Sequence, residues 1–172
     1  GDMYAALYTS GMLDRLLQRG KRYAFISNAD NLGAVLNPSI LGYFVRNGLQ
    51  FLMEVAKRSP SDKKGGHLAK QGDGRLVLRE IAQCPEQDLE AFQDINRHQY
   101  FNTNSIWLDL QALKTMIDNS GLPRLPLIVN PKTLDPRDES SPMVYQLETA
   151  MGAAISAFEH SGALHVHRRR FA

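Results

Sequence analysis

Short apolar runs alternate along the chain with segments whose apolar residues recur at helical spacing. The apolar runs are typical of buried strands, and they cover residues 23–27, 49–55, 101–108, 125–129 and 164–167. The helical spacing, with its capping signals, covers residues 4–17, 37–48, 85–95, 110–119 and 146–159. A turn at residues 72–74 separates two further short segments, 66–69 and 75–83, which predicts a hairpin.

Strands that alternate with helices in this way favour an α/β fold with a mostly parallel sheet flanked by helices. The predicted hairpin makes that sheet mixed. In such sheets ligands bind beyond the carboxyl ends of the strands. Three polar segments, 28–30, 102–104 and 130–132, are expected at that edge. The charged and turn-rich segment 135–142 is expected to be a solvent-exposed loop.

Composition narrows the class of protein. The 172 residues are enough for one domain or one lobe of a larger one, and 43% hydrophobic residues exclude a wholly disordered chain. A net charge of +2 gives no argument for nucleic acid or an anionic membrane, and no apolar run reaches the roughly 18 residues of a membrane span. No basic-then-apolar pattern in these residues marks the chain for secretion, and a lone Cys84 cannot form an intrachain disulfide, so we expect a cytoplasmic protein.

Asp30 and Asn28 are the first candidates for chemistry, because both follow a predicted buried strand directly. A carboxylate in this position can hold a hard cation such as Mg2+, which takes oxygen ligands from protein, water and substrate phosphates. The alternative is that both residues form a turn and cap the following helix. The residues alone leave both interpretations open.

The remaining candidates are weaker when each is taken alone. Lys64-Gly65-Gly66 combines a cation with two glycines that let a ligand approach the backbone, but an ordinary surface loop has the same composition. Lys132 can contact a phosphate or lie in solvent, and the same alternatives hold for residues 168–170, three consecutive arginines. No P-loop, dinucleotide fingerprint, zinc-ligand spacing or nucleophile elbow is present. For Cys84, a buried structural thiol is favoured over a nucleophile.

Taken together, these segments resemble the UTP–glucose-1-phosphate uridylyltransferase family, also known as UDP-glucose pyrophosphorylase. The resemblance rests on seven segments in the family's order: 1–7 (GDMYAAL), 25–34 (FISNADNLGA), 64–66 (KGG), 80–83 (EIAQ), 101–104 (FNTN), 130–132 (NPK) and 146–154 (QLETAMGAA). The first is similar to the end of G-H-G-D-x-Y-x-A-L, and the second is similar to S-N-x-D-N-L-G-A. Together they span nearly the whole chain.

The resemblance implies a Rossmann-like nucleotide-diphospho-sugar transferase fold and a reaction of UTP with glucose-1-phosphate that gives UDP-glucose and pyrophosphate with Mg2+. It implies Asp30 and Lys132 as catalytic residues, and Asn28 and Asp30 as the residues that hold the metal. The implied substrate-binding residues are Gly1, Asn28, Ala29, Asp30, Lys64, Gly65, Gly66, Glu80 and Asn104. The implied partners are these small molecules, with no nucleic acid and no membrane, and an oligomer is possible.

The resemblance also implies that residues 1–172 are part of a catalytic domain, the half that binds the sugar phosphate. The family's N-terminal nucleotide loop, the phosphate-binding lysine of its R-F-x-P-V-K motif and its C-terminal β-helix domain are all absent from this sequence. Two alternatives stay open. This chain alone is a noncatalytic folded module that binds sugar phosphate weakly at most, or the family is that of the UDP-N-acetylhexosamine pyrophosphorylases.

Overall fold

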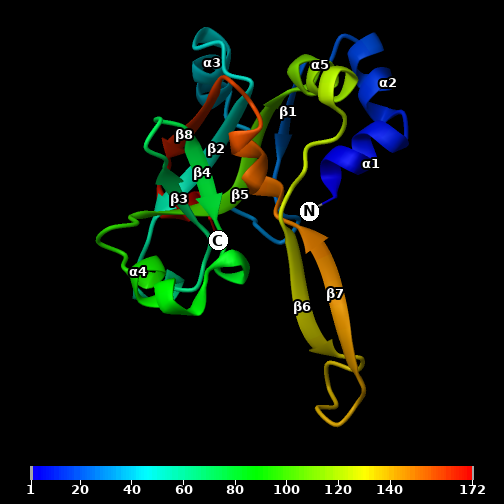
Figure 1. The fold of residues 1–172 in the computed structure, drawn as a ribbon. Helices are drawn as coiled ribbons and strands as arrows, with labels where there is room; N and C mark the ends of the chain where they lie inside the picture. The colour runs from blue at the N-terminus through cyan, green and yellow to red at the C-terminus, as the bar shows by residue number, and fades with distance from the viewer. Residues whose placement is uncertain (1, 172) are drawn as a thin grey trace.

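The computed structural model describes residues 2–171, which form a mixed sheet, five α-helices and a separate two-stranded ribbon (Figure 1). The helices are α1 (Met3–Thr9), α2 (Met12–Gln18), α3 (Pro38–Arg46), α4 (Leu89–Gln93) and α5 (Leu110–Ser120). The strands are β1 (Tyr23–Ile26), β2 (Phe51–Lys57), β3 (His67–Lys70), β4 (Leu76–Arg79), β5 (Tyr100–Asp109), β6 (Leu127–Thr133), β7 (Met143–Thr149) and β8 (Ser161–His165). Five short 3-10 helices include η1 (Pro60–Asp62), η4 (Met151–Ser156) and η5 (Arg168–Arg170).

The six-stranded sheet has the order β4-β3-β5-β2-β8. β1 pairs with residues 106–109 of β5, on the edge opposite β2. The α/β class and the mixed sheet are confirmed, but the prediction of a mostly parallel sheet is wrong for the described residues. Only β2 and β8 pair in parallel, whereas the other four pairings are antiparallel. The reason lies in the order of the strands. The connection from β1 through α3 to β2 does join two parallel strands, but β5 lies between them and runs the other way.

Both faces of β2 and β5 are covered, because successive side chains of a strand point to opposite faces. On one face, Phe51, Met53 and Ile106 pack with α1, α2, α5 and η4. On the other face, Leu52 and Trp107 pack with α3 and with Val166 beyond β8. The core therefore continues through the sheet from one helical layer to the other.

Local signals explain where the helices begin and end. The predicted helix over residues 4–17 is two helices, because Gly11 has a left-handed φ of 68° between α1 and α2. Asn37 caps α3, and its side chain accepts from the amide of Ser39 at 2.9 Å. Asp109 caps α5 in the same way, with a 2.8 Å bond from the amide of Gln111.

The β6–β7 ribbon projects away from the main sheet, and residues 134–142 form its exposed tip, as predicted for the charged loop (Figure 1). The predicted helix over residues 146–159 is wrong, because residues 146–149 belong to β7 and only η4 follows. Val144 and Tyr145 favour an extended strand, and the backbone of β7 finds its hydrogen-bond partners in β6. Periodicity within the segment could not reveal that pairing.

Two further findings concern the described residues as a whole. None of their helices is long and apolar enough to cross a lipid bilayer. Cys84 is a free cysteine that is half-buried, so it is less enclosed than the predicted structural thiol.

Candidate functional site

The loop that follows β1 leads directly to the centre of the sheet. β1 ends with Ile26 opposite Ile106, and because the two strands are antiparallel the chain continues toward the preceding residues of β5. Asn28, Ala29 and Asp30 are exposed there, and neither polar side chain makes a hydrogen bond or ion pair with any described residue. The residue that caps the next helix is Asn37 instead. The capping part of the alternative is therefore wrong for Asn28 and Asp30. The turn part is confirmed, because the carbonyl of Asn28 accepts from the backbone amide of Asn31 at 3.2 Å.

A bulge in β5 lies next to this loop. Glu54 of β2 pairs with Ser105 and the next residue, Val55, pairs with Asn102, so Thr103 and Asn104 are extra residues on the β5 side. Asn104 has a φ of 57°, which only a few residue types adopt without strain. Such bulges redirect side chains, and conformations of this kind are concentrated at functional sites.

The side chains of the bulge hold one another in place. The amide of the Asn102 side chain donates to Oδ1 of Asn104 at 2.8 Å, and Oδ1 of Asn102 accepts from the Asn104 backbone amide at 2.9 Å. Thr103 turns the other way and donates to the Glu54 carbonyl at 2.7 Å. The bulge thus presents a fixed pair of carboxamides, groups that both donate and accept hydrogen bonds.

Gly66 and Glu80 lie beside these carboxamides. The carbonyl of Gly66 accepts from the backbone amide of Asn102 at 3.1 Å, which ties the Lys64–Gly66 segment to β5. A Cβ atom on Gly66 would overlap the carboxylate of Glu80, so with a larger residue at position 66 this side chain would have to move. On the same side, a Cβ atom on Gly152 would lie 2.7 Å from Nδ2 of Asn102. Two glycines therefore leave room around the carboxylate and the carboxamides.

Burial raises the pKa of Glu80 to about 7, and the nearby charge of Glu148 acts in the same direction. Glu80 therefore exists near neutral pH as a mixture of the acid, which can donate a hydrogen bond, and the carboxylate, which accepts. Glu148 belongs to the β6–β7 ribbon and accepts from Nδ2 of Asn130 at 2.7 Å. A set of carboxylates and carboxamides with both roles suits a ligand rich in hydroxyl groups.

Lys132 lies two residues after Asn130 on β6, so both side chains point to the same face of the ribbon. Its side chain is exposed and makes no ion pair with any described residue. Lys64 and Gly65 are likewise exposed, at the end of the turn that begins with η1. Lys64 and Lys132 are therefore accessible cations that have no ion pair within the part of the chain that the structure describes.

The structure thus sorts the residues predicted from sequence into groups. Gly66, Glu80 and Asn104 come together around the bulge, and residues 28–30 form a separate exposed loop that approaches it. Lys64 and Gly65 directly precede Gly66, and Lys132 lies near the far end of β6, two residues beyond Asn130. None of the three makes a hydrogen bond or ion pair to either group among the described residues, and Gly1 lies outside the described residues. Sequence reasoning missed Asn102, Asn130 and Glu148 as site residues, although all three belong to the motifs quoted above.

Asn28 and Asp30 fit the needs of Mg2+ in part. Both offer oxygen atoms that are exposed and unpaired within the described residues, which suits a hard cation. No group of three or more His, Cys, Asp or Glu residues among the described residues could hold a metal without help. An ion here would take most of its ligands from water and phosphate oxygens, which is the usual habit of Mg2+.

Comparison with known proteins decides the family. The family model for UTP–glucose-1-phosphate uridylyltransferase matches residues 1–172. The chain belongs to this family. The probable UTP–glucose-1-phosphate uridylyltransferase of Schizosaccharomyces pombe is 43% identical over 171 residues, and the corresponding barley (Hordeum vulgare) enzyme is 42% identical over the same length. The resemblance predicted from the sequence motifs is confirmed.

Solved structures agree with the family assignment. A UDP-glucose phosphorylase structure from Trypanosoma brucei is 56% identical, with a TM-score of 0.89 over the whole chain. A mutant UDP-glucose pyrophosphorylase from Leishmania major, solved in complex with UDP-glucose, is 50% identical, with a TM-score of 0.87. The chain covers 37% and 39% of those two structures and 33% and 35% of the yeast and barley relatives. It therefore spans about a third of the length of the proteins it matches.

Proposed function

We propose that the full-length protein that contains this chain transfers a uridylyl group from UTP to glucose-1-phosphate. An oxygen of the sugar phosphate attacks the α-phosphorus of UTP and forms a new P–O bond. The bond from the α-phosphorus to the bridging oxygen breaks, and its electron pair leaves with pyrophosphate. UDP-glucose is the other product, and no proton needs to be transferred if both phosphates react in their ionised forms.

The observation that carries this proposal is the cluster of hydroxyl-binding groups beside the bulge. Asn104 and Glu80 would contact the hexose, and Gly66 with its neighbour Gly65 would let the sugar approach the backbone. The positions of these donors and acceptors would select the sugar, because a buried polar site rejects a ligand that leaves its hydrogen-bonding groups unpaired. The titration of Glu80 near neutral pH lets that one side chain act in either role.

The phosphates would lie toward the exposed loop after β1. Asn28, Ala29 and Asp30 would line this end of the site, and Asn28 and Asp30 would hold Mg2+ together with phosphate oxygens. Bound there, Mg2+ would supply positive charge to phosphate oxygens. Lys64 and Lys132 would add positive charge from the two borders of the site. Reactions of this kind depend on in-line positioning and on neutralisation of the crowded negative charge.

The same proposal gives the chain its place in the larger protein. Residues 1–172 would be the part of the catalytic domain that binds the sugar phosphate, and the nucleotide loop would come from the rest of the polypeptide. Further strands supplied from outside the chain would extend the sheet toward a Rossmann-like arrangement. The chain by itself would then bind sugar phosphate weakly and lack turnover.

The test is pyrophosphate release by the full-length protein with UTP, Mg2+ and a panel of sugar phosphates. We expect turnover with glucose-1-phosphate, and the absence of turnover would contradict the proposal. Turnover with N-acetylhexosamine-1-phosphate in place of glucose-1-phosphate would contradict the sugar assignment only.

The Asp30→Ala variant tests the metal end of the site. We expect kcat to fall by roughly 100-fold or more at saturating Mg2+, because a group that acts on the transferring phosphate is lost. The melting temperature should change little, because the Asp30 side chain is exposed and makes no hydrogen bond or ion pair with any described residue. Equal turnover in the variant and the wild type would show that Asp30 is a loop residue with no part in the reaction.

A further inference from the structure

The short helix η5 near the C-terminal end of the chain contacts both loops of the proposed site. It follows β8 and consists of the three consecutive arginines 168–170. Nδ1 of His167 caps it by accepting from the Arg169 amide at 3.1 Å. The sequence alone allowed these arginines to be solvent-exposed without a role, but the structure places two of the three in ion pairs.

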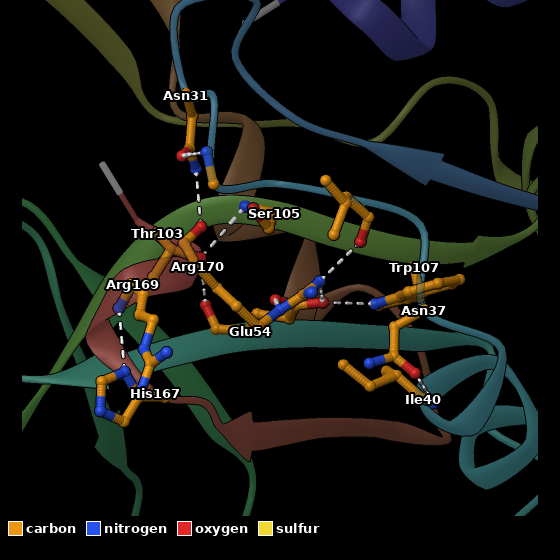
Figure 2. A network of polar contacts seen from close by, with 12 residues as sticks. Asn31, Asn37, Ile40, Glu54, Thr103, Ser105, Trp107, His167, Arg169 and Arg170 are labelled. Carbon is orange, nitrogen blue, oxygen red and sulfur yellow. Dashed lines mark hydrogen bonds and ion pairs between the residues drawn. The ribbon is translucent and has the colours of Figure 1, made fainter.

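Arg170 is fixed by a buried carboxylate in the centre of the sheet (Figure 2). Its Nε and Nη2 atoms each donate to an oxygen of Glu54 at 2.8 Å. Glu54 is fully buried and also accepts from Nε1 of Trp107 at 2.9 Å. Bidentate pairs of this kind are strong and directional, so the plane of the Arg170 guanidinium is set by the sheet.

The same arginine reaches the loop after β1. Nη2 of Arg170 donates to the carbonyl of Val35 at 2.9 Å, and the carbonyl of Arg170 accepts from Nδ2 of Asn31 at 3.2 Å. Gly33 lies so close to the turn that a Cβ atom there would overlap the carbonyl of Arg169. Residues 31–35 thus rest on η5, only a few residues beyond Asn28 and Asp30.

Arg168 holds the second loop. Its two terminal nitrogens donate to the carboxylate of Asp62 at 2.8 Å and 3.0 Å. The hydrogen bond from Arg168 lowers the pKa of Asp62 to about 2. The Asp62 backbone carbonyl accepts from the amide of Gly65 at 3.0 Å, which shapes the turn that presents Lys64 to Gly66.

We propose that Arg170 and Arg168 are positioning residues for the reaction, and that η5 sets the spacing between the 28–35 loop and the 62–66 loop. The inference rests on the proposed function, because those loops carry the proposed metal-binding and sugar-binding residues. Arg170 acts on the loop with Asn28 and Asp30, whereas Arg168 acts on the loop with Lys64 to Gly66. The Arg170 contact is the stronger one, because Glu54 is fully buried while the Arg168 side chain is 44% exposed.

The arginine between them provides a matched control. The Arg169 side chain makes no hydrogen bond or ion pair with any described residue. Arg169→Met therefore removes the same charge from the same turn without touching either loop. The three Arg→Met variants lose the same net charge. Any difference between them in activity or exchange therefore comes from the contacts that each arginine makes.

The experiment compares Arg168→Met, Arg169→Met and Arg170→Met in the full-length protein by hydrogen–deuterium exchange and steady-state kinetics. For Arg170→Met we expect faster exchange at residues 31–35 and a fall in kcat of about 100-fold, the size of effect that a small displacement of reacting groups produces. For Arg168→Met we expect faster exchange at residues 62–66 and about a threefold rise in KM for glucose-1-phosphate, since an exposed ion pair contributes less. Arg169→Met should match the wild type in both.

Arg170→Met also leaves the Glu54 charge unpaired, which can prevent folding. The double variant Glu54→Gln/Arg170→Met removes both charges and keeps an acceptor for Trp107. It should melt near the wild-type temperature and still show fast exchange at residues 31–35 with low kcat. A double variant with wild-type kcat would overturn the positioning role, as would unchanged exchange in that loop.

Failure of the proposed function gives a different result. If the wild-type protein releases no pyrophosphate from UTP and glucose-1-phosphate, the proposed function is wrong whatever the exchange data show. If the wild type is active and the Arg170 variants are as active as Arg169→Met, the positioning proposal alone is wrong.

Discussion

The strand β2 and the ribbon strand β7 have the same length and similar apolar content but opposite surroundings. β2 has partners on both edges and a covering layer on both faces, and six of its seven residues are buried. β7 has β6 as its partner, and Tyr145 and Leu147 are 70% and 59% exposed. One face of the ribbon is a row of exposed apolar side chains, which includes Leu127, Val129, Tyr145 and Leu147.

The difference shows that pairing with another strand does not by itself bury a strand in this protein. Both segments pair with a neighbouring strand, but only β2 is paired on both edges and lies between two layers that exclude water. The proposed site lies where the two regions meet. Asn104 comes from the sheet, Glu148 comes from the ribbon, and Glu80 lies between them.

The largest expected effect compares one aromatic side chain from each region. Phe51 is fully buried and stacks on Phe158 with 5.5 Å between ring centroids. Phe51→Ala should lower the free energy of unfolding by about 3–5 kcal/mol, the usual cost of a large cavity. Tyr145→Ala in the ribbon should change it by less than about 0.5 kcal/mol, as for other surface substitutions. Urea unfolding of both variants measures the contrast, and similar losses would mean that the ribbon is packed as tightly as the sheet.

The next prediction concerns pH and the buried His67 of β3. Burial lowers its pKa to about 3, and the neighbouring positive groups of His98, Arg58 and Arg79 act in the same direction. The unfolded chain binds a proton below about pH 6.5 that the folded chain refuses, so stability is full above that pH. The free energy of unfolding should fall between pH 6.5 and 4, with a slope of up to about 1.4 kcal/mol per pH unit from this one group.

His67→Phe should flatten that slope, because Phe keeps the ring packing against Phe92 but cannot bind a proton. The quantity to compare is the difference in the free energy of unfolding between the variant and the wild type, measured at each pH. Glu80 contributes with the opposite sign, since its raised pKa of about 7 favours the folded state at lower pH. A difference that does not change with pH would show that His67 is protonated as easily in the folded chain as in the unfolded one.

Asn104 allows strain and ligand contact to be separated. Asn104→Ala removes the carboxamide and places an alanine at a φ of 57°, which costs about 1 kcal/mol of stability. Asn104→Gly removes the same group without that strain. In the full-length protein both variants should raise KM for glucose-1-phosphate. The alanine variant should melt at a lower temperature than the glycine variant, because both lose the bond between the Asn102 and Asn104 side chains and only alanine adds the strain. If KM rises only in the alanine variant, the residue acts through the backbone.

The smallest expected effect tests how the ribbon influences the site. Glu148→Gln removes the charge that adds to the raised pKa of Glu80. The pKa of Glu80, measured by NMR titration of its side-chain carbon, should fall but stay above that of an ordinary glutamate, because burial is the larger cause. Thr149→Ser in the same strand is a control that leaves the charge unchanged. An unchanged pKa in Glu148→Gln would place the ribbon too far from Glu80 to act on it.

Much of the fold could be predicted from the chain because its signals are local. The apolar run of β2, the 72–74 hairpin turn and the helix after Asp109 depend on residues close in sequence. The seven motifs that include Asn28, Gly66 and Asn104 indicate the family when they are taken together and in order. The ribbon was harder, because Leu147 recurs with Met151, Ile155 and Phe158 at a spacing that a helix also allows.

The direction of the strands and the arrangement of the site needed the tertiary structure. The insertion of β5 between β1 and β2, and its bulge at Thr103–Asn104, depend on pairings between residues about 50 to 80 positions apart. No local pattern shows that Arg170 pairs with Glu54, 116 residues earlier in the chain.

The amino-acid sequence by itself therefore determined most of the elements, the family and the kinds of chemical groups available. Only the tertiary structure decided which of those groups meet. The physical reason is that hydrophobic periodicity and turn chemistry act within a few residues, whereas ion pairs, bulges and burial depend on the packing of distant segments. Three consecutive arginines look alike in the sequence, but packing makes Arg170 the partner of a buried carboxylate and leaves Arg169 exposed.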